Sequence, residues 1–467
     1  MSPTVALVMY GWIPIVLYLF TRYSPPRAVI ISFVIAWLFL PQAAIVLPSI
    51  PDYTKMSATC YGILLAVFVF DSGRFSTFKP GWIDGLMALY CISPFVSSMA
   101  NGLGAYDGVS SSLEQVVSWG LPYFFGRLYL SNLAGMKHLA IAIFAGGLTY
   151  IPFTLYESRF SPQLHRMVYG YHARADFSQT MRMGGYRPTV FMSHGLAVGA
   201  WMMAAALVGI WLWKSGVLKK YWDQPMKTLV PVMVVSFLNC RSTGAYLLLV
   251  FGLIILFLGS KLKTYIPLIF LVVFIGTYLY MGATGYITPD RRDSIEEFVT
   301  KTLNAERAQS LIFRLENEEL LSEKARQRPV FGWGGWGRAR VYDDYGKDIS
   351  VTDSLWIIAF GNQGAFGLIT LFSTMIVPSF LLCVSRYPPK VWAHPLAAPA
   401  VCVAVVTILF ALDCVLNAMP NPIFTLSSGG IAGLVLKPEP LRKRVPKRKP
   451  AGRSLPRRRQ SIPLASP

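Results

Sequence analysis

Residues 396–415 read LAAPAVCVAVVTILFALDCV, an apolar run whose one charged side chain is Asp413. A helix rises 1.5 Å per residue, so about 20 residues cross the roughly 30 Å hydrocarbon core of a bilayer. Similar runs fill most of the 467-residue chain, which is 54% hydrophobic and 14% charged. They are too long for barrel strands and do not alternate. The sequence therefore predicts an all-α polytopic membrane protein and excludes an ordinary soluble enzyme.

Thirteen stretches have the composition of membrane spans, and because three of them are short we expect 12 or 13 transmembrane helices. They cover residues 4–20, 28–47, 57–70, 81–100, 113–130, 138–157, 189–213, 228–241, 244–260, 264–282, 354–384, 396–415 and 421–436. Lysine and arginine mark every second loop, as at Arg22, Lys137 and Lys261. By the positive-inside rule that side is cytoplasmic, so the N-terminus is periplasmic. The first run lacks a charged segment before it, and we interpret it as a retained span.

The net charge of +20 is concentrated at the C-terminus. Residues 437–467 contain eleven Lys or Arg against one acid, Glu439, with many prolines among them. This composition predicts a disordered cytoplasmic tail that lies against anionic lipid, and it does not indicate nucleic-acid binding. The transmembrane domain is then residues 1–436.

Two long loops fall on the predicted periplasmic side. The loop at 158–188 has one acid, Asp176, and its five basic residues are all arginines: Arg159, Arg166, Arg174, Arg182 and Arg187. Arginine recognises phosphate and carboxylate groups bidentately, so the loop is suited to a multiply charged anion. The alternative is that these arginines pair with lipid headgroups or with acids of the other loop.

The second loop, residues 283–353, has eleven basic and thirteen acidic residues, a balance typical of a folded subdomain. Apolar residues at helical spacing predict a helix over 291–324. A glycine-rich turn, FGWGGWG, follows at 331–337. Gly332 and Gly334 would let backbone N–H groups approach a ligand, while Trp333 and Trp336 would stack on sugar rings. The alternative is a tight aromatic turn at the membrane interface.

Four features follow one another in a fixed order on this predicted face. They are Arg187-Pro-Thr-Val-Phe-Met-Ser-His194-Gly195, Arg241-Ser-Thr-Gly-Ala245, Arg314, and Arg328-Pro-Val-Phe-Gly-Trp-Gly334 leading to Asp353-Ser354 and Gly364-x-x-Gly367. This order, over residues 120–385, resembles the O-antigen ligase and polymerase superfamily of bacterial membrane glycosyltransferases. The resemblance implies a GT-C-like helical fold with a large helical periplasmic loop, in the inner membrane. In the ligases a histidine stands where this chain has Asp353, which favours a polymerase.

The resemblance implies that Arg241 and Arg314 are the arginines that bind the donor diphosphate, with Arg187 as a third candidate and Arg328 as a further contact. Fixed guanidinium groups stabilise the charge that gathers on a leaving diphosphate. An acceptor hydroxyl needs a base, for which the candidates are Asp353 and His194. Alternatively, Asp353 is the N-cap of the next helix and His194 is a satisfied polar residue between helices. We expect no metal and no cofactor.

These expectations define a polymerase that joins polyprenyl-diphosphate-linked oligosaccharide units of a surface polysaccharide or exopolysaccharide. Its partners would be that lipid-linked glycan, the bilayer and a chain-length regulator or other assembly protein. One alternative is an O-antigen-type ligase that transfers glycan to a lipid or protein. Outside enzymes, the alternative is a transporter of lipid-linked sugar or ions, supported by Asp84 and Asp413 inside predicted spans.

Overall fold

Helices make up 72% of the computed structural model and strands 3%, because apolar segments must satisfy their backbone groups internally. The structure describes residues 2–47, 51–173, 180–286, 297, 300–301 and 305–441. In that part of the chain, seven helices are long and apolar enough to cross a membrane. The polytopic, all-helical class is thereby confirmed. Arg174, Asp176 and most of the predicted basic tail lie outside the described residues.

Every predicted span coincides with helical structure. The long apolar helices are α1 (Pro3–Arg22), α7 (Leu133–Phe160), α9 (Gly195–Lys214), α11 (Thr243–Leu253) continued by η4 (Ile254–Leu258) and α12 (Gly259–Leu262), α13 (Ile266–Thr284), α16 (Leu355–Leu381) continued by η5 (Leu382–Arg386), and α17 (Ala398–Leu416). The shorter apolar ones are α2 (Pro25–Phe39), α3 (Lys55–Phe70), α10 (Met226–Leu238) and α18 (Pro422–Leu436).

The remaining elements are short or connect these helices. They are α4 (Asp84–Ala100), α5 (Ala105–Gln115), η2 (Val116–Gly120), α6 (Leu121–Tyr129), α8 (Leu164–Tyr169), α15 (Ala305–Arg326), the 3-10 turns η1 (Ser72–Thr77) and η6 (Pro389–Val391), and three antiparallel hairpins, β1 (Ala44–Ile45) with β2 (Tyr53–Thr54), β3 (Met181–Arg182) with β4 (Gly185–Tyr186), and β5 (Lys220–Tyr221) with β6 (Gln224–Pro225). Helix α15 confirms the described part of the helix predicted over 291–324.

The predicted helix ends differ most from the structure at three places, and two of these have a local cause. Helix α2 ends at Phe39 and not at 47, because Leu40 precedes Pro41 and takes an extended conformation (φ −69°, ψ 147°). Helix α9 begins at Gly195 and not at 189, since Val190 lies in the left-handed region (φ 51°). The fifth helical stretch begins earlier than predicted, at Ala105.

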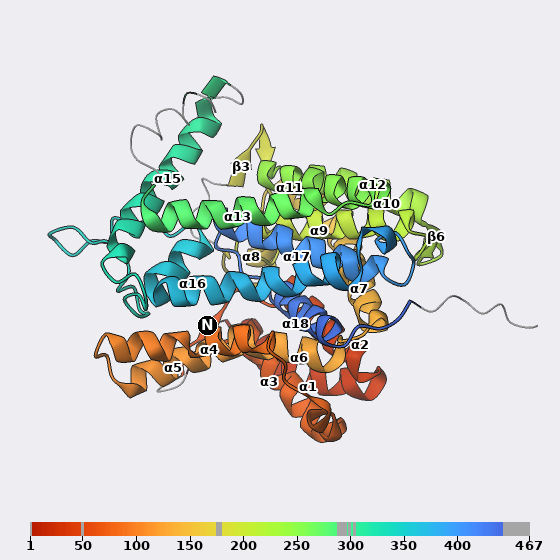
Figure 1. The fold of residues 1–467 in the computed structure, drawn as a ribbon, viewed down its shortest axis with the longest axis horizontal. Helices are drawn as coiled ribbons and strands as arrows, with labels where there is room; N and C mark the ends of the chain where they lie inside the picture. The colour runs from red at the N-terminus through yellow and green to blue at the C-terminus, as the bar shows by residue number, and fades with distance from the viewer. Residues whose placement is uncertain are drawn as a thin grey trace, which may run out of the picture.

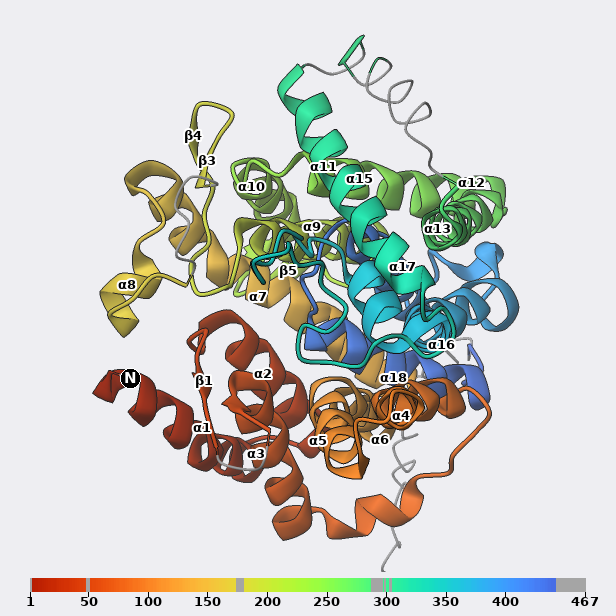
Figure 2. The ribbon, with the colours of Figure 1, turned by 90° about the vertical axis from the view of Figure 1, so that its left-hand side faces the viewer.

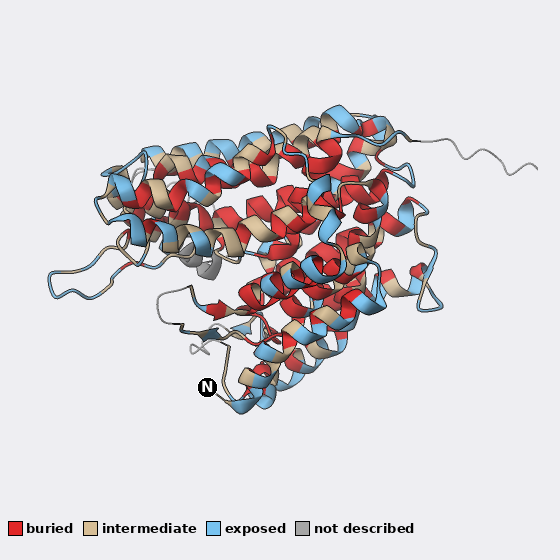
Figure 3. Ribbon diagram, turned by 90° about the horizontal axis from the view of Figure 1, so that it is seen from below, coloured by how far each residue is buried: buried red, intermediate tan, exposed pale blue. Residues whose placement is uncertain are grey.

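The helices form layers around a middle set made by α16, α17 and α18 (Figures 1 and 2). Helices α1 and α3 to α6 lie on one side of this set, and α10 to α13 lie on the other. Buried residues are concentrated along the central helices (Figure 3), above all α9 and α17. Helices α6 and α18 pack backbone to backbone, since a Cβ on Gly126 would lie 2.0 Å from the carbonyl oxygen of Leu426.

Loops that the sequence assigns to the same side contact one another. On the predicted periplasmic side, Asn101 donates to the carbonyl oxygen of Gly332 over 2.8 Å. On the predicted cytoplasmic side, the N–H of Leu133 donates to the carboxylate of Glu439 over 3.0 Å. Helix α15 lies at one end of the bundle and hairpin β5–β6 at the other (Figure 1). The assignment of loops to two faces is therefore consistent, and which compartment each face meets stays a prediction.

Candidate active site

Arg241 lies in the short connection between α10 and α11, and its guanidinium is enclosed by hairpin β3–β4. Nη1 donates to the carbonyl oxygens of Arg182 (3.1 Å) and Met183 (2.6 Å) at the hairpin turn. A Cβ on Gly185 would lie 2.4 Å from the same guanidinium. The hairpin can therefore close on Arg241 only because position 185 is glycine.

Arg187 and Arg241 are in direct contact although they are 54 residues apart. Nη2 of Arg187 donates to the carbonyl oxygen of Arg241 over 3.1 Å. The Arg187 side chain is 6% exposed and packs on the first residue of α9, where a Cβ on Gly195 would lie 2.3 Å from its Cδ. The structure thus brings together two of the predicted diphosphate-binding arginines.

The backbone is strained around this arginine pair. Met183, Val190 and Arg241 all have φ between 49° and 52°, a region that non-glycine residues rarely occupy and that is costly for a β-branched residue. The buried carboxylate of Glu157 holds the chain in place by accepting from the N–H groups of Thr189 (2.8 Å) and Val190 (2.7 Å). Strain of this kind costs about 1–3 kcal/mol per residue and clusters at ligand-binding sites.

His194 is the N-cap of α9. Its Nδ1 accepts from the N–H of Leu196 over 3.0 Å, and the side chain is 4% exposed. Because Nδ1 uses its lone pair in this bond, the ring proton is on Nε2, and that nitrogen then has no lone pair with which to remove a proton. The geometry therefore favours the interpretation of His194 as a hydrogen-bonded polar residue between helices and not as a general base.

Arg314 projects from α15 onto the end of α17. Its Nη1 lies 3.2 Å from the carbonyl oxygen of Leu416 and 3.4 Å from Oδ1 of Asn417, and donates to both. Asn417 in turn donates from Nδ2 to Oδ1 of Asp413 over 2.8 Å. Asp413 is therefore linked to Arg314 through the side-chain amide of Asn417.

Glu318 is a buried acid that the sequence analysis missed. It lies one helical turn beyond Arg314, is 7% exposed, and accepts from the hydroxyl of Tyr278 (2.8 Å) and from that of Ser354. Burial raises the pKa of this carboxyl, opposed by its hydrogen bonds. The spacing of Arg314 and Glu318 along one helix face was the available signal. Glu318 joins α13, α15 and the start of α16.

Asp353 is not the N-cap of α16, because Ser354 occupies that position. Its own carboxylate is partly exposed and makes no hydrogen bond with the residues that the structure describes. The capping alternative for Asp353 is therefore wrong. Asp353 directly precedes Ser354 in the chain, and the Ser354 hydroxyl contacts Glu318 on the helix that carries Arg314.

The glycine-rich turn docks into a break in α16. At Gly364 the helix has φ 63° and ψ −161°, and the N–H groups of Trp333 and Gly334 donate to the freed carbonyl oxygens of Gly361 and Asn362, each over 2.9 Å. A Cβ on Gly332 would lie 2.6 Å from the backbone of Asn362. The glycines at 332 and 364 are needed for this close approach, and the N–H groups of 333 and 334 are used inside the protein.

The side chains of the turn have separate surroundings. Trp333 donates from Nε1 to the carbonyl oxygen of Lys324 (2.8 Å), and the charged ends of Lys324 and Arg328 lie 4.6 and 4.5 Å from its ring centroid. Arg328 also donates to the side-chain oxygen of Asn101. Trp336 is 73% exposed, so its ring is accessible to a ligand.

The candidate residues form three groups. Arg187, Arg241 and His194 make the first, and Arg314 with Glu318 and Asp353 makes the second. The segment after α17 connects these two, since Asn417 contacts Arg314 while Met419 lies 3.9 Å from the Ser193 hydroxyl. The glycine-rich turn with Arg328 makes the third group, and it packs on α4 through Asn101.

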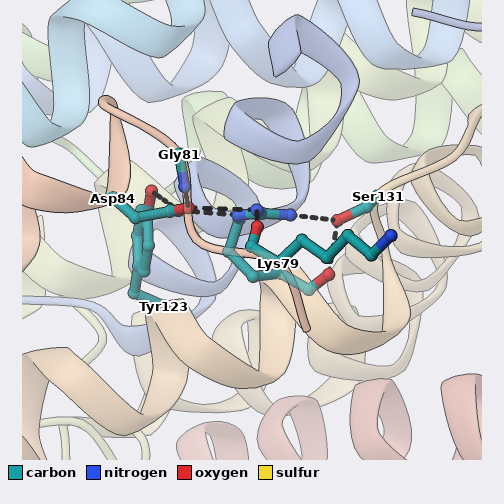
Figure 4. A network of polar contacts seen from close by, with 6 residues as sticks. Lys79, Gly81, Asp84, Tyr123 and Ser131 are labelled. Carbon is teal, nitrogen blue, oxygen red and sulfur yellow. Dashed lines mark hydrogen bonds and ion pairs between the residues drawn. The ribbon is translucent and has the colours of Figure 1, made fainter. Parts of the chain in front are cut away.

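Asp84, the other acid within a predicted span, belongs to a closed network on the opposite face (Figure 4). Its two oxygens lie 2.6 and 3.0 Å from Nε and Nη2 of Arg127. Tyr123 donates to Oδ1 (2.8 Å) and the N–H of Gly81 to Oδ2 (2.7 Å). Both partners of the ion pair are 9% exposed. This carboxylate has a full set of hydrogen-bond donors, and through them it links helix α4 with helix α6.

No protein-family model matches this chain, and no curated protein matches its sequence. Within the described residues, no group of three or more His, Cys, Asp or Glu side chains is arranged to hold a metal ion. The six cysteines are free thiols. The groups that remain available for chemistry are the arginines and acids of the predicted periplasmic face.

Proposed function

We propose that this protein is a membrane glycosyltransferase that polymerises polyprenyl-diphosphate-linked oligosaccharide units at the periplasmic face of a bacterial inner membrane. The observation that carries the proposal is how the guanidinium groups of Arg241 and Arg314, in two neighbouring groups of candidate residues, are held. Within the described residues both guanidinium groups donate to neutral oxygens, and neither lies within ion-pair distance of a carboxylate. Both guanidinium groups are thus oriented by neutral oxygens, and Arg314 also has the carboxyls of Glu318 and Asp413 in its surroundings; an oriented guanidinium is what bidentate recognition of a diphosphate requires.

The transfer step follows from this arrangement. The acceptor hydroxyl attacks the anomeric carbon of the donor sugar, the bond to the diphosphate breaks, and the hydroxyl proton passes to a base. The leaving diphosphate gains negative charge, which Arg241 and Arg314 stabilise, with Arg187 in contact with Arg241. Asp353 is the base in this scheme because its carboxylate has no hydrogen-bond partner in the described structure to compete with the incoming proton.

A ligase that transfers the glycan to a lipid or protein acceptor would use the same donor chemistry. The replacement of the ligase histidine by Asp353 favours the polymerase. Exposed Trp336 provides an aromatic surface for an acceptor sugar in either case.

A transporter remains the candidate from another class, and one observation favours it. Oδ2 of Asp413 is buried within α17 and has no hydrogen-bond partner in the described structure. Acids that carry protons through membranes occupy such positions. The closed network around Asp84 removes the second acid that supported this reading.

Deleting the gene in its host and separating the surface, secreted and lipid-linked glycans on a sizing gel tests the proposal. A polymerase predicts loss of long polymer and accumulation of single repeat units on their lipid carrier. Long polymer that stays on its carrier would instead identify a ligase. Glycans unchanged in size and amount would overturn both enzyme readings and leave the transporter.

A further inference from the structure

A groove of about 920 Å³ runs between α2 and α7. Its walls are mostly apolar, and it exists because α7 presents small residues there, among them Ala142, Ala145 and Gly146. The α2 side contributes Ile31 and Ile35, of which Ile35 is 37% exposed. The groove is therefore open to the surroundings of the helix bundle, which for a membrane protein are lipid chains.

One end of the groove is positively charged. Arg27, Lys137 and His138 line it there, and none of the lining residues within the described part of the chain is acidic. Nη2 of Arg27 lies 3.4 Å from Nε2 of His138, to which the guanidinium donates. Both helices begin at this end, at Pro25 and Leu133, so their positive dipole ends add to the charge. Among the residues that the structure describes, no acid lines the space that these basic groups share, and the Glu439 carboxylate at the start of α7 accepts from the N–H of Leu133.

The length of the groove matches one leaflet. From Arg27 to Leu38, both lining residues, the helix rises about 17 Å, whereas half of a bilayer core is roughly 15 Å. An elongated apolar molecule with an anionic head would place its head at Arg27 and its chain beside Ile31 and Ile35. An apolar protein helix would place no anionic group against Arg27 and Lys137.

We propose that the groove between α2 and α7 binds an anionic glycerophospholipid of the cytoplasmic leaflet, whose phosphodiester bridges Arg27 and His138 beside Lys137. Basic pockets between membrane helices on this side are suited to such headgroups. The site is independent of the proposed transfer reaction, because Arg27 and Lys137 belong to the loops predicted to lie on the face opposite Arg241. The lipid acts here as a fixed component that holds α2 against α7.

The test is a titration of the detergent-purified full-length protein with phosphatidylglycerol or with phosphatidylcholine of the same chains, followed by thermal unfolding. Phosphatidylglycerol should raise the melting temperature at lower concentration than phosphatidylcholine. Arg27→Gln and His138→Gln should each weaken the phosphatidylglycerol effect about tenfold, the value of one hydrogen bond to a charged group. Lys261→Gln, an exposed basic residue of the same predicted face outside the groove, should leave it unchanged.

A groove-filling variant separates chain binding from headgroup binding. Ala142→Phe should reduce the stabilisation by phosphatidylglycerol although Arg27, Lys137 and His138 are all present. This variant also tests lipid binding if Arg27→Gln fails to fold. Equal stabilisation by the two phospholipids, or equal behaviour of Arg27→Gln and Lys261→Gln, would overturn the proposal. Displacement of phosphatidylglycerol by a polyprenyl phosphate at much lower concentration would reassign the groove to a different lipid.

Discussion

Arg127 and Arg241 show two ways of holding an arginine side chain in one membrane protein. Arg127 is clamped by both oxygens of Asp84, whose other donors are Tyr123 and Gly81, so the pair is neutral and closed (Figure 4). Arg241 is held as firmly, but by backbone carbonyl oxygens of hairpin β3–β4. The carbonyl groups fix its geometry without cancelling its charge.

This difference in partners distinguishes an arginine that stabilises the fold from one that is able to bind an anionic ligand. A buried charge paired with a carboxylate is expensive to disrupt and has nothing left to offer a ligand. A charge held by neutral dipoles keeps its attraction for an anion and is already oriented. Arg314, which donates to a carbonyl and an amide oxygen at the end of α17, belongs to the second kind.

The largest effect is expected from opening the neutral pair. Arg127→Ala leaves Asp84 buried without its cation, which costs about 3–5 kcal/mol of stability. We expect a large fall in the amount of folded protein in membranes and in its melting temperature. Arg74→Ala is the matched control, because Arg74 lies on the same predicted face and donates to the carbonyl oxygen of Leu128. Equal loss in both variants would contradict the distinction.

Removing an outer-face arginine should affect activity and spare the fold. Arg241→Ala and Arg314→Ala should each lower polymer formation about 10²–10³-fold, as loss of one donor to a developing negative charge does. Polymer length and protein level in membranes are the measurements. Arg340→Ala, which removes an arginine already paired with Asp348 in the same loop, should leave polymer normal. Normal polymer from Arg241→Ala would remove the diphosphate-binding hypothesis.

Asp353→Asn tests whether the outer face supplies a base as well as cations. Turnover should fall at least about a hundredfold if Asp353 accepts the proton. Stability should hardly change, since the carboxylate makes no hydrogen bond within the described residues. Asp344→Asn in the same loop serves as the control. A variant that turns over normally would transfer the role of base to another group.

Gly364→Ala tests the docking of the outer loop on the membrane helices. A Cβ there would lie 2.4 Å from the backbone of Val330, at a φ of 63°. We expect a loss of about 1–3 kcal/mol in stability, together with faster proteolysis of the loop. Gly346 has a similar φ (76°) but nothing within 4 Å of a Cβ. Gly346→Ala therefore measures the stability lost to an unfavourable backbone conformation without a steric clash. Identical losses would mean that the close contact is unimportant.

The smallest effect concerns Glu318. Its raised pKa means that the folded protein holds this proton more tightly than the unfolded chain, so its stabilising contribution is present at low pH and is lost as the pH rises through the folded pKa. Glu318→Gln should therefore gain stability relative to the unmodified protein as the pH rises above the ordinary pKa of a glutamate. A stability difference between the two proteins that is the same at every pH would show that Glu318 does not make this contribution.

The sequence alone was sufficient for the helices, because apolar length is a local property. Their ends at Phe39 and Gly195 depended on Pro41 and on a strained Val190, and only the first of these has a signal in the sequence. Contacts within the candidate site could not be derived. Arg187 meets the carbonyl oxygen of Arg241 across 54 residues, and Asn101 meets that of Gly332 across 231. Such pairings depend on how helices assemble, which residue spacing does not encode.

The break at Gly364 has a consequence for assembly of the protein. The apolar run Leu355–Leu381 is long enough to enter the bilayer as one segment. The carbonyl oxygens of Gly361 and Asn362, about 10 Å along that helix, find their donors in residues 333 and 334 of the outer loop. The backbone bonding of this helix is therefore complete only when the loop that carries residues 333 and 334 has docked on it. A folding defect in that loop would then leave α16 with unpaired backbone carbonyl groups and would reduce the amount of correctly assembled protein in the membrane.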